Sequence, residues 1–459
     1  MVCIKIITGR YSPRKQIYLL FFFFIFLLFD FICVQAEDWP TWRHDVGRTG
    51  ATLEALPSSL HLQWTLKLPP LVPAYKDSRL QFDKGYEPIV TNGKLIVGSS
   101  WTDSVTAYDA VTGEQVWRFL AEGPIRFAPA ALDGRVFVGS DDGFLYCLQT
   151  DSGKLLWKFR GVPSTRKVLG NGRMISLWPV RGGPVAKAGK VWFAAGVWPM
   201  EGVFVHCLDA KTGKSIWIND RCGFIYGTQP HNAKATGGLA PQGYLLLDGD
   251  DLVVPSSVAF PARFDAATGK LKEFELPSQG RLPGGWFAST ASEKEKQRLQ
   301  RRGLLFDSEV NQRRHEDRIR SSGQPGIRST IEMDGQDFRF SKGIAGITGE
   351  IHQALVANGR LYVVTMDGEI HCLGTPTETA KIHQSKPNRS RSVGKNGLVA
   401  DILNATQFRQ GYGLVLGMSE KWLGLVENSS ARLVGIGLPD TVNAFRKKLN
   451  ESGFTAEKV

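Results

Sequence analysis

Short runs in which every second residue is apolar recur along the chain, and each run ends at a turn signal. The stretch 136–159, VFVGSDDGFLYCLQTDSGKLLWKF, holds three such runs. A period of two is that of strands with one buried face. Asp142-Gly143 and Ser152-Gly153 lie where the chain must reverse, because glycine tolerates the positive φ of tight hairpin turns. We therefore predict a small antiparallel meander at 136–159.

This meander repeats along the chain. Gly113 and Gly153 are 40 residues apart, and so are Trp117 and Trp157. Periods of about 40 residues with four strands each are typical of propeller blades, in which an aromatic residue of the outer strand packs between neighbouring blades. The turn glycines and outer-strand tryptophans that define the repeat are Trp64, Gly113, Trp117, Gly153, Trp157, Gly213, Trp217 and Gly269.

The spacing of these units predicts an all-β fold, a β-propeller of six or seven four-stranded blades over residues 37–374. Seven blades require residues 275–350 to hold two degenerate units. Trp64 ends a strand that has no inner strands before it, and the last unit stops at Gly374 without a tryptophan strand. We therefore predict that the amino-terminal strand completes the last blade, which closes the ring and removes exposed edges.

The pattern resembles the pyrroloquinoline-quinone-type (PQQ-like) propeller repeat family, and residues 39–50, WPTWRHDVGRTG, resemble the leader that often precedes such propellers. If this chain were a quinoprotein dehydrogenase, the resemblance would imply a pair of adjacent cysteines stacked on the quinone and a Ca²⁺ held near a catalytic Asp. This chain has no Cys-Cys dipeptide and no hydrolase or zinc motif. We therefore expect a non-catalytic scaffold or binding module with no bound cofactor and no metal. A PQQ-dependent dehydrogenase is the alternative.

The insertions between strands predict where a ligand or a partner protein would bind. Loops between second and third strands and between blades emerge on one face of a propeller, here called the insertion face, and long loops on a rigid scaffold often bind ligands. The alternative is that these loop residues pack only on one another. The candidates for an anion or polar-ligand site on the insertion face are Arg126, Arg181, Trp198, His231 and Asn232.

The amino terminus has the layout of a secretory signal peptide over residues 1–36. Basic residues precede the apolar run 17–29, and Val34-Gln35-Ala36 offers small residues for cleavage. An uncleaved anchor is the alternative, because residues 17–34 approach the length that spans a bilayer. We expect a periplasmic or extracellular protein, bound to a membrane only if this segment is retained.

Charge and cysteine content add little to this picture. The net charge is +12, and its excess is concentrated in residues 281–330 and from Lys381 onward. A basic surface can attract nucleic acid or anionic lipid, but solvated loops and a solvated linker are the simpler interpretation, so nucleic acid is not favoured. The four cysteines after the signal are expected to be buried thiols, because equivalent positions in separate blades are too far apart to bridge: Cys147, Cys207, Cys222 and Cys372.

After Gly374 the composition changes. Residues 375–395 are polar and predict a linker. Residues 396–459 predict helix, strand, helix, strand and helix, the start of a doubly wound, Rossmann-like α/β fold. This segment is similar to the opening of class I S-adenosylmethionine-dependent methyltransferases, since Gly417 keeps the first glycine of the cofactor turn. Gly437, however, stands where the ribose-binding carboxylate is expected. We predict a partial, degenerate methyltransferase-like segment. An S-adenosylmethionine-binding methyltransferase linked to the propeller is the third hypothesis.

Overall fold

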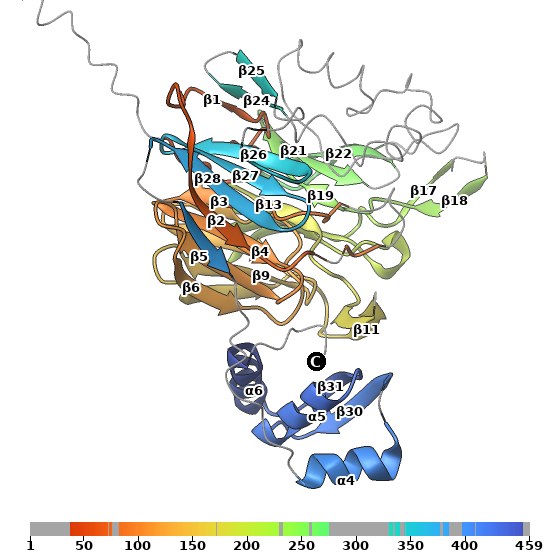
Figure 1. Cartoon of the computed structure of the whole chain (residues 1–459). Helices are drawn as coiled ribbons and strands as arrows, with labels where there is room; N and C mark the ends of the chain where they lie inside the picture. The colour runs from red at the N-terminus through yellow and green to blue at the C-terminus, as the bar shows by residue number, and fades with distance from the viewer. Residues whose placement is uncertain are drawn as a thin grey trace, which may run out of the picture. The chain divides into compact units, whose positions relative to one another are not determined.

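A computed structural model (Figure 1) describes most of the chain between residues 37 and 452. The residues outside the description are 1–36, 72, 76–81, 171, 229–232, 257–258, 275–329, 334–335, 340–343, 345, 377–379, 385–396, 409 and 453–459. The predicted signal peptide and most of the predicted linker therefore lie outside the described residues. Among the helices that are described, none has the length and apolar character needed to cross a membrane.

Four-stranded antiparallel meanders follow one another along the chain, and each strand pairs with the next one in sequence (Figure 1). Alternating apolar residues bury their faces between neighbouring meanders. Blade 1 consists of β3 (Ile89–Thr91), β4 (Lys94–Ser99), β5 (Ser104–Asp109) and β6 (Gln115–Leu120), and blade 2 of β7 (Ala130–Leu132), β8 (Arg135–Gly139), β9 (Phe144–Gln149) and β10 (Leu155–Arg160). Blade 3 consists of β13 (Gly182–Lys187), β14 (Lys190–Ala195), β15 (Phe204–Asp209) and β16 (Ser215–Asn219). Blade 4 consists of β20 (Leu246–Asp248), β21 (Asp251–Ser256), β22 (Ala259–Asp265) and β23 (Leu271–Glu273).

The closing blade combines both ends of the propeller. It holds β26 (Ile351–Ala357), β27 (Arg360–Thr365), β28 (Glu369–Gly374) and the amino-terminal strand β2 (His61–Lys67). β2 pairs antiparallel with β28, and Trp64 lies opposite Cys372. A fifth strand, β29 (Lys381–Gln384), pairs in parallel with the outer edge of β2. The predicted closure by the amino-terminal strand is confirmed.

The predicted β-propeller architecture is thus confirmed, while the blade number stays a prediction. The described residues form five blades, short two-stranded hairpin sheets, and one three-stranded sheet in which two strands lie between blade 4 and the closing blade in sequence. That sheet contains β1 (Ala51–Thr52), β24 (Thr330–Met333) and β25 (Gln336–Arg339). Much of the sequence on which the choice between six and seven blades depends, residues 275–329, lies outside the described residues.

Tryptophans of the outer strands pack against the turn glycines of the next blade. Gly153 has φ of 66°, and a Cβ atom there would lie 2.5 Å from the Trp117 ring. A Cβ atom at Gly213 would lie 2.6 Å from the Trp157 ring. The Trp117 Nε1 group donates a hydrogen bond to the Thr150 carbonyl at 2.8 Å. Glycine is needed here for two reasons, the left-handed backbone and the close approach of an aromatic ring.

The segment 38–54, which contains the leader at 39–50, runs across the inner strands and contacts successive blades. Trp39 forms a bridge with Val90 of blade 1. Arg48 is fully buried and donates to the Pro184 carbonyl of blade 3 at 3.0 Å. Glu54 accepts a hydrogen bond at 3.0 Å from the turn between β26 and β27 of the closing blade. One extended segment therefore ties together blades that are far apart in sequence.

The longest connections carry additional short elements. They are the hairpins β11 (Lys167–Gly170) with β12 (Arg173–Ser176) and β17 (Ile225–Thr228) with β18 (Lys234–Gly237), the strand β19 (Gly243–Tyr244), and the 3₁₀ turn η1 (Pro199–Glu201). They lie in the loops that the sequence predicts for the insertion face.

The carboxy-terminal segment has its own small core of buried apolar residues. Its elements are α4 (Gly397–Thr406), β30 (Tyr412–Leu416), η2 (Glu420–Trp422), α5 (Leu423–Asn428), β31 (Arg432–Ile436) and α6 (Pro439–Glu451). β30 and β31 pair in parallel, as expected when a helix connects two strands. The element order agrees with the apolar spacing of the sequence. The methyltransferase resemblance stays a prediction.

Candidate functional site

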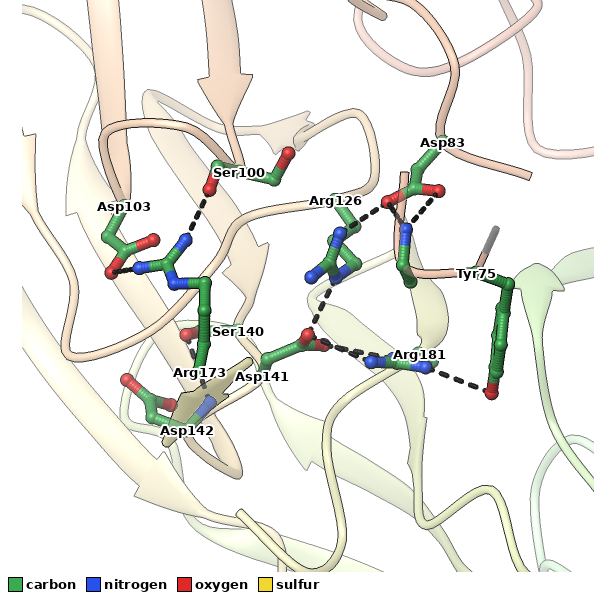
Figure 2. A network of polar contacts seen from close by, with 11 residues as sticks. Tyr75, Asp83, Ser100, Asp103, Arg126, Ser140, Asp141, Asp142, Arg173 and Arg181 are labelled. Carbon is green, nitrogen blue, oxygen red and sulfur yellow. Dashed lines mark hydrogen bonds and ion pairs between the residues drawn. The ribbon is translucent and has the colours of Figure 1, made fainter. Parts of the chain in front are cut away.

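A buried polar network lies where the chain enters blades 2 and 3 (Figure 2). Its centre is Asp141, in the turn between β8 and β9. Arg126, ahead of β7, donates from Nε to Asp141 Oδ2 at 2.6 Å. Arg181, directly before β13, donates from Nε and Nη2 to the same carboxylate at 3.1 and 3.0 Å. All three side chains are buried, so one carboxylate joins two guanidinium groups away from water.

Two residues ahead of blade 1 complete this network (Figure 2). Asp83 accepts a hydrogen bond from Arg126 Nη1 at 2.5 Å and another from the Ala74 backbone amide at 3.0 Å. Tyr75 accepts one at its hydroxyl from Arg181 Nη1 at 3.2 Å. Two arginines therefore face two aspartates, and the formal charges of the network balance.

Aromatic rings hold the same region in place. Phe82 and Phe127 stack with ring centroids 5.0 Å apart, and Tyr244 meets Phe127 edge-on at 5.1 Å. Trp42 of the leader stacks on Tyr244 at 4.1 Å. The Arg181 guanidinium lies 5.8 Å from the centre of the Phe82 ring. Such packing fixes the positions of the charged groups, because a displaced arginine would lose both its carboxylate and its aromatic neighbours.

Asp142, the next residue in the turn, has the opposite protonation behaviour to Asp141. Burial raises the pKa of Asp142 to about 6, although its carboxylate accepts hydrogen bonds from the Tyr146 hydroxyl at 2.6 Å and from the Phe144 amide at 2.9 Å. Burial also acts to raise the pKa of Asp141, but Arg181 and Arg126 outweigh it and hold that pKa at about 2. Asp142 is therefore the member of this region that is able to exchange a proton near neutral pH.

This shift predicts a pH-dependent stability. The folded pKa of Asp142, about 6, exceeds its unfolded value, so its contribution to stability is complete below the unfolded pKa and is lost as the pH rises through 6. Asp142→Asn stays neutral throughout. The quantity to compare is the unfolding free energy of the variant minus that of the wild type. We expect this difference to increase by about 1–3 kcal/mol from about pH 4 to about pH 8, because only the wild type loses stability as the pH rises. Urea unfolding at both pH values measures this, and an unchanged difference would contradict it.

A separate ion pair ties an insertion to blade 1 (Figure 2). Arg173, at the start of β12, donates from Nη2 to Asp103 Oδ2 at 2.5 Å and from Nη1 to the Ser100 carbonyl at 2.6 Å. Burial raises the pKa of Asp103, which Arg173 opposes. The β11–β12 hairpin is thereby anchored on the loop between β4 and β5.

The structure brings together two of the five residues that the sequence suggests as a ligand site. Arg126 and Arg181 share Asp141. Trp198 lies in the loop between β14 and β15, where 59% of its surface is exposed, and it is not a member of the network. His231 and Asn232 lie outside the described residues.

Sequence reasoning missed the acidic half of the network. Asp141 and Asp142 belong to the most regular repeat. An Asp-Asp-Gly sequence is common in hairpin turns, so its presence there did not indicate a functional site. Asp83 has no motif around it. The signal that could have identified the site is the doubled acid itself, because one aspartate is enough to cap such a turn.

Metal-ligating groups are not gathered elsewhere in the described part of the chain. No set of three or more His, Cys, Asp or Glu side chains there could hold a metal ion. The cysteines Cys147, Cys207, Cys222 and Cys372 are all free and buried, as predicted. Burial raises the pKa of the Cys222 thiol to about 12, which makes it unreactive at neutral pH.

Comparison with known proteins finds similarity over part of the chain. Residues 40–177 match a family model described as outer membrane protein assembly factor BamB. The dehydrogenase subunit of the quinone alcohol dehydrogenase of Gluconobacter oxydans (strain 621H) is 31% identical over 153 residues, which cover 30% of this chain and 19% of that protein. The corresponding subunit of Komagataeibacter europaeus is 30% identical over 153 residues, 30% of this chain and 20% of its own length. The chain thus spans about a fifth of the length of these curated relatives.

Solved structures of the same kind are more distant. The quinohemoprotein alcohol dehydrogenase of Comamonas testosteroni has 20% sequence identity and a TM-score of 0.40, covering 53% of this chain and 42% of that chain. BamB from Moraxella catarrhalis has 14% identity and a TM-score of 0.29, covering 70% of this chain and 99% of that chain.

These relatives correct two predictions. The expectation of a non-catalytic scaffold is wrong, because the curated relatives are named as dehydrogenase subunits of quinone alcohol dehydrogenases. The expectation that no cofactor is bound is wrong for the same reason. Both predictions relied on the missing Cys-Cys pair, a feature of one site, whereas the similarity extends over 153 residues. The matched residues 40–177 lie within the stretch whose repeats resemble the PQQ-like propeller family.

Proposed function

We propose that this chain is the propeller part of a quinone-dependent oxidoreductase that acts on alcohols, with pyrroloquinoline quinone as its cofactor. The observation that carries the proposal is the 31% identity over 153 residues to a quinone alcohol dehydrogenase subunit. The signal-like amino terminus supports a location outside the cytoplasm, where the apolar run 17–29 would direct export.

The two buried arginines, Arg126 and Arg181, do not by themselves form a site for this cofactor. The quinone carries carboxylates, so its site needs cations that are not already neutralised. Arg126 and Arg181 are paired with Asp83 and Asp141. Among the described residues no group of three or more His, Cys, Asp or Glu side chains could hold a metal ion.

Direct reconstitution tests the proposal. The purified full chain is mixed with pyrroloquinoline quinone and Ca²⁺, freed of excess quinone by gel filtration, and supplied with ethanol and an artificial electron-accepting dye. We expect quinone to stay with the protein and the dye to be reduced only when the alcohol is present. A chain that elutes without quinone, while its circular dichroism spectrum shows folded protein, would contradict the proposal.

One variant asks whether the buried arginines take part. Asp83→Asn keeps an oxygen that can accept from the Ala74 amide, but removes one of the two negative charges around Arg126. If the arginines bind quinone carboxylates, the variant should retain the quinone more tightly than the wild type, because the network then carries an excess positive charge. An unchanged affinity places the cofactor away from this network.

A further inference from the structure

A cavity of about 780 Å³ lies between the propeller and the carboxy-terminal segment. The loop between β4 and β5, the β11–β12 hairpin, β31 and α6 contribute to its wall. Arg432 of β31 donates from Nη1 to the Gly172 carbonyl at 2.6 Å, and Arg446 of α6 donates to the Ala121 carbonyl. The volume is typical of small-ligand sites, roughly 300–1,000 Å³. No member of the Asp141 network is among the described residues that line this cavity, so it is a separate candidate site.

Basic side chains predominate around the cavity. Arg173 pairs with Asp103, and Lys158 pairs with Glu122 at 3.1 Å. Burial acts to raise the pKa of Glu122, but Lys158 and other nearby cations outweigh burial and lower that pKa. An excess of positive charge in a cavity attracts an anionic ligand. Among the described residues, five cations and two carboxylates line this cavity: Lys158, Lys167, Arg173, Arg432 and Arg446, with Asp103 and Glu122.

Asp103 brings an unused hydrogen-bond acceptor to the cavity wall. Its Oδ2 atom accepts from Arg173 Nη2 at 2.5 Å, whereas its Oδ1 atom is buried and has no hydrogen-bond partner among the described residues. Only 5% of the Asp103 side chain is exposed. A buried acceptor without a donor costs free energy, and a ligand hydroxyl that donates to Oδ1 would remove that cost.

Apolar side chains form another part of the wall. Met174, Tyr412 and Ile436 line the cavity, although 36%, 49% and 53% of their surfaces are exposed. A flat ring placed against these side chains would remove apolar surface from water on both partners. The cavity therefore combines positive charge, a hydroxyl acceptor and an apolar surface.

We propose that this cavity binds a nucleoside phosphate. The phosphate lies among the cations, a ribose hydroxyl donates to Asp103 Oδ1, and the base packs against the exposed Tyr412 ring. S-adenosylmethionine, the cofactor that the sequence resemblance implies for the carboxy-terminal segment, carries a sulfonium cation and no phosphate, so the excess positive charge disfavours it. The inference does not depend on the proposed quinone chemistry, because the two sets of residues are separate.

Isothermal titration calorimetry of the full chain with AMP tests the proposal, and adenosine is the matched control ligand. We expect AMP to bind, and adenosine to bind at least about tenfold more weakly, because the phosphate forms charge-assisted hydrogen bonds with the cations. S-adenosylmethionine should bind no more tightly than adenosine. A chain that binds neither AMP nor adenosine overturns the proposal, and so does one that binds both equally or prefers S-adenosylmethionine.

One exposed lysine tests where the phosphate binds. Lys167→Gln removes a cation of the cavity wall without opening a buried space, because Lys167 is exposed on β11. We expect its Kd for AMP to rise about three- to tenfold while its Kd for adenosine stays unchanged. Lys187→Gln is the matched control, an exposed lysine at the end of β13 that does not line the cavity, and it should change neither constant. Equal effects of the two substitutions on AMP binding overturn the placement of the phosphate.

A ligand analogue tests the role of Asp103 without altering the protein. 2′,3′-Dideoxyadenosine 5′-monophosphate lacks both ribose hydroxyls, so it leaves Asp103 Oδ1 without a donor. We expect it to bind about five- to tenfold more weakly than AMP. An analogue that binds as tightly as AMP overturns the contact between the ribose and Asp103.

Discussion

Asp141→Asn should lower the free energy of unfolding by about 3–5 kcal/mol, because it leaves two buried guanidinium groups with the single carboxylate of Asp83. Both arginines lie in surroundings that water does not reach, so their charges cannot be solvated instead. Asp83 pairs with Arg126, so Arg181 loses the one carboxylate with which it pairs among the described residues. Chemical unfolding followed by circular dichroism measures the loss.

Two further variants keep this prediction falsifiable. Asp151→Asn removes the same charge from an exposed pair with Lys94, where 61% of the Asp151 side chain is accessible, and should cost much less stability than Asp141→Asn. Arg181→Met added to Asp141→Asn removes the uncompensated cation and should recover part of the loss. Equal losses at Asp141 and Asp151 would show that burial does not strengthen this pair.

Gly153→Ala should destabilise the propeller more than Gly134→Ala, by about 1–3 kcal/mol. The two glycines have φ of 66° and 70°, so the strain of a left-handed alanine is the same at both positions. A Cβ atom at Gly153 would lie 2.5 Å from the Trp117 ring, whereas none of the surrounding atoms lies within 4 Å of one at Gly134. The difference between the two variants therefore isolates the packing of the tryptophan on the next blade.

Urea unfolding of both variants gives this difference directly. The Trp117 ring is held by its hydrogen bond to the Thr150 carbonyl, so it cannot move away from a new methyl group without losing that bond. Equal destabilisation at the two positions would mean that the tryptophan yields freely and that the interface between blades 1 and 2 does not depend on this contact.

Local patterns predicted the propeller well because each blade is built from neighbours in sequence. Alternating apolar residues and turn glycines act within a few residues of one another, so the strands around 136–159 follow from the sequence. Closure by β2 could also be predicted, since one end of the chain lacks the strand that the other end supplies. The carboxy-terminal helices and strands follow from their apolar spacing in the same way.

The candidate site could not be predicted in this way, because its members come from separate segments. Asp83, Arg126, Asp141 and Arg181 are ordinary loop residues when the sequence is considered alone, and only folding brings them within hydrogen-bonding distance. The sequence also favours an open arginine site, whereas the structure pairs each arginine with an aspartate. Whether an arginine and an aspartate form an ion pair depends on the distance between them in the folded chain, and the spacing of apolar residues does not encode that distance.

By itself, then, the sequence determined the repeat, the β-propeller architecture, the closing strand and the buried thiols, because strand period and turn chemistry are local. Only the tertiary structure decided that the Asp-Asp-Gly turn of the most regular blade carries the centre of the polar network. The reason is electrostatic: the same two adjacent carboxylates acquire pKa values of about 2 and about 6, depending on whether arginines or only neutral donors surround them once they are buried.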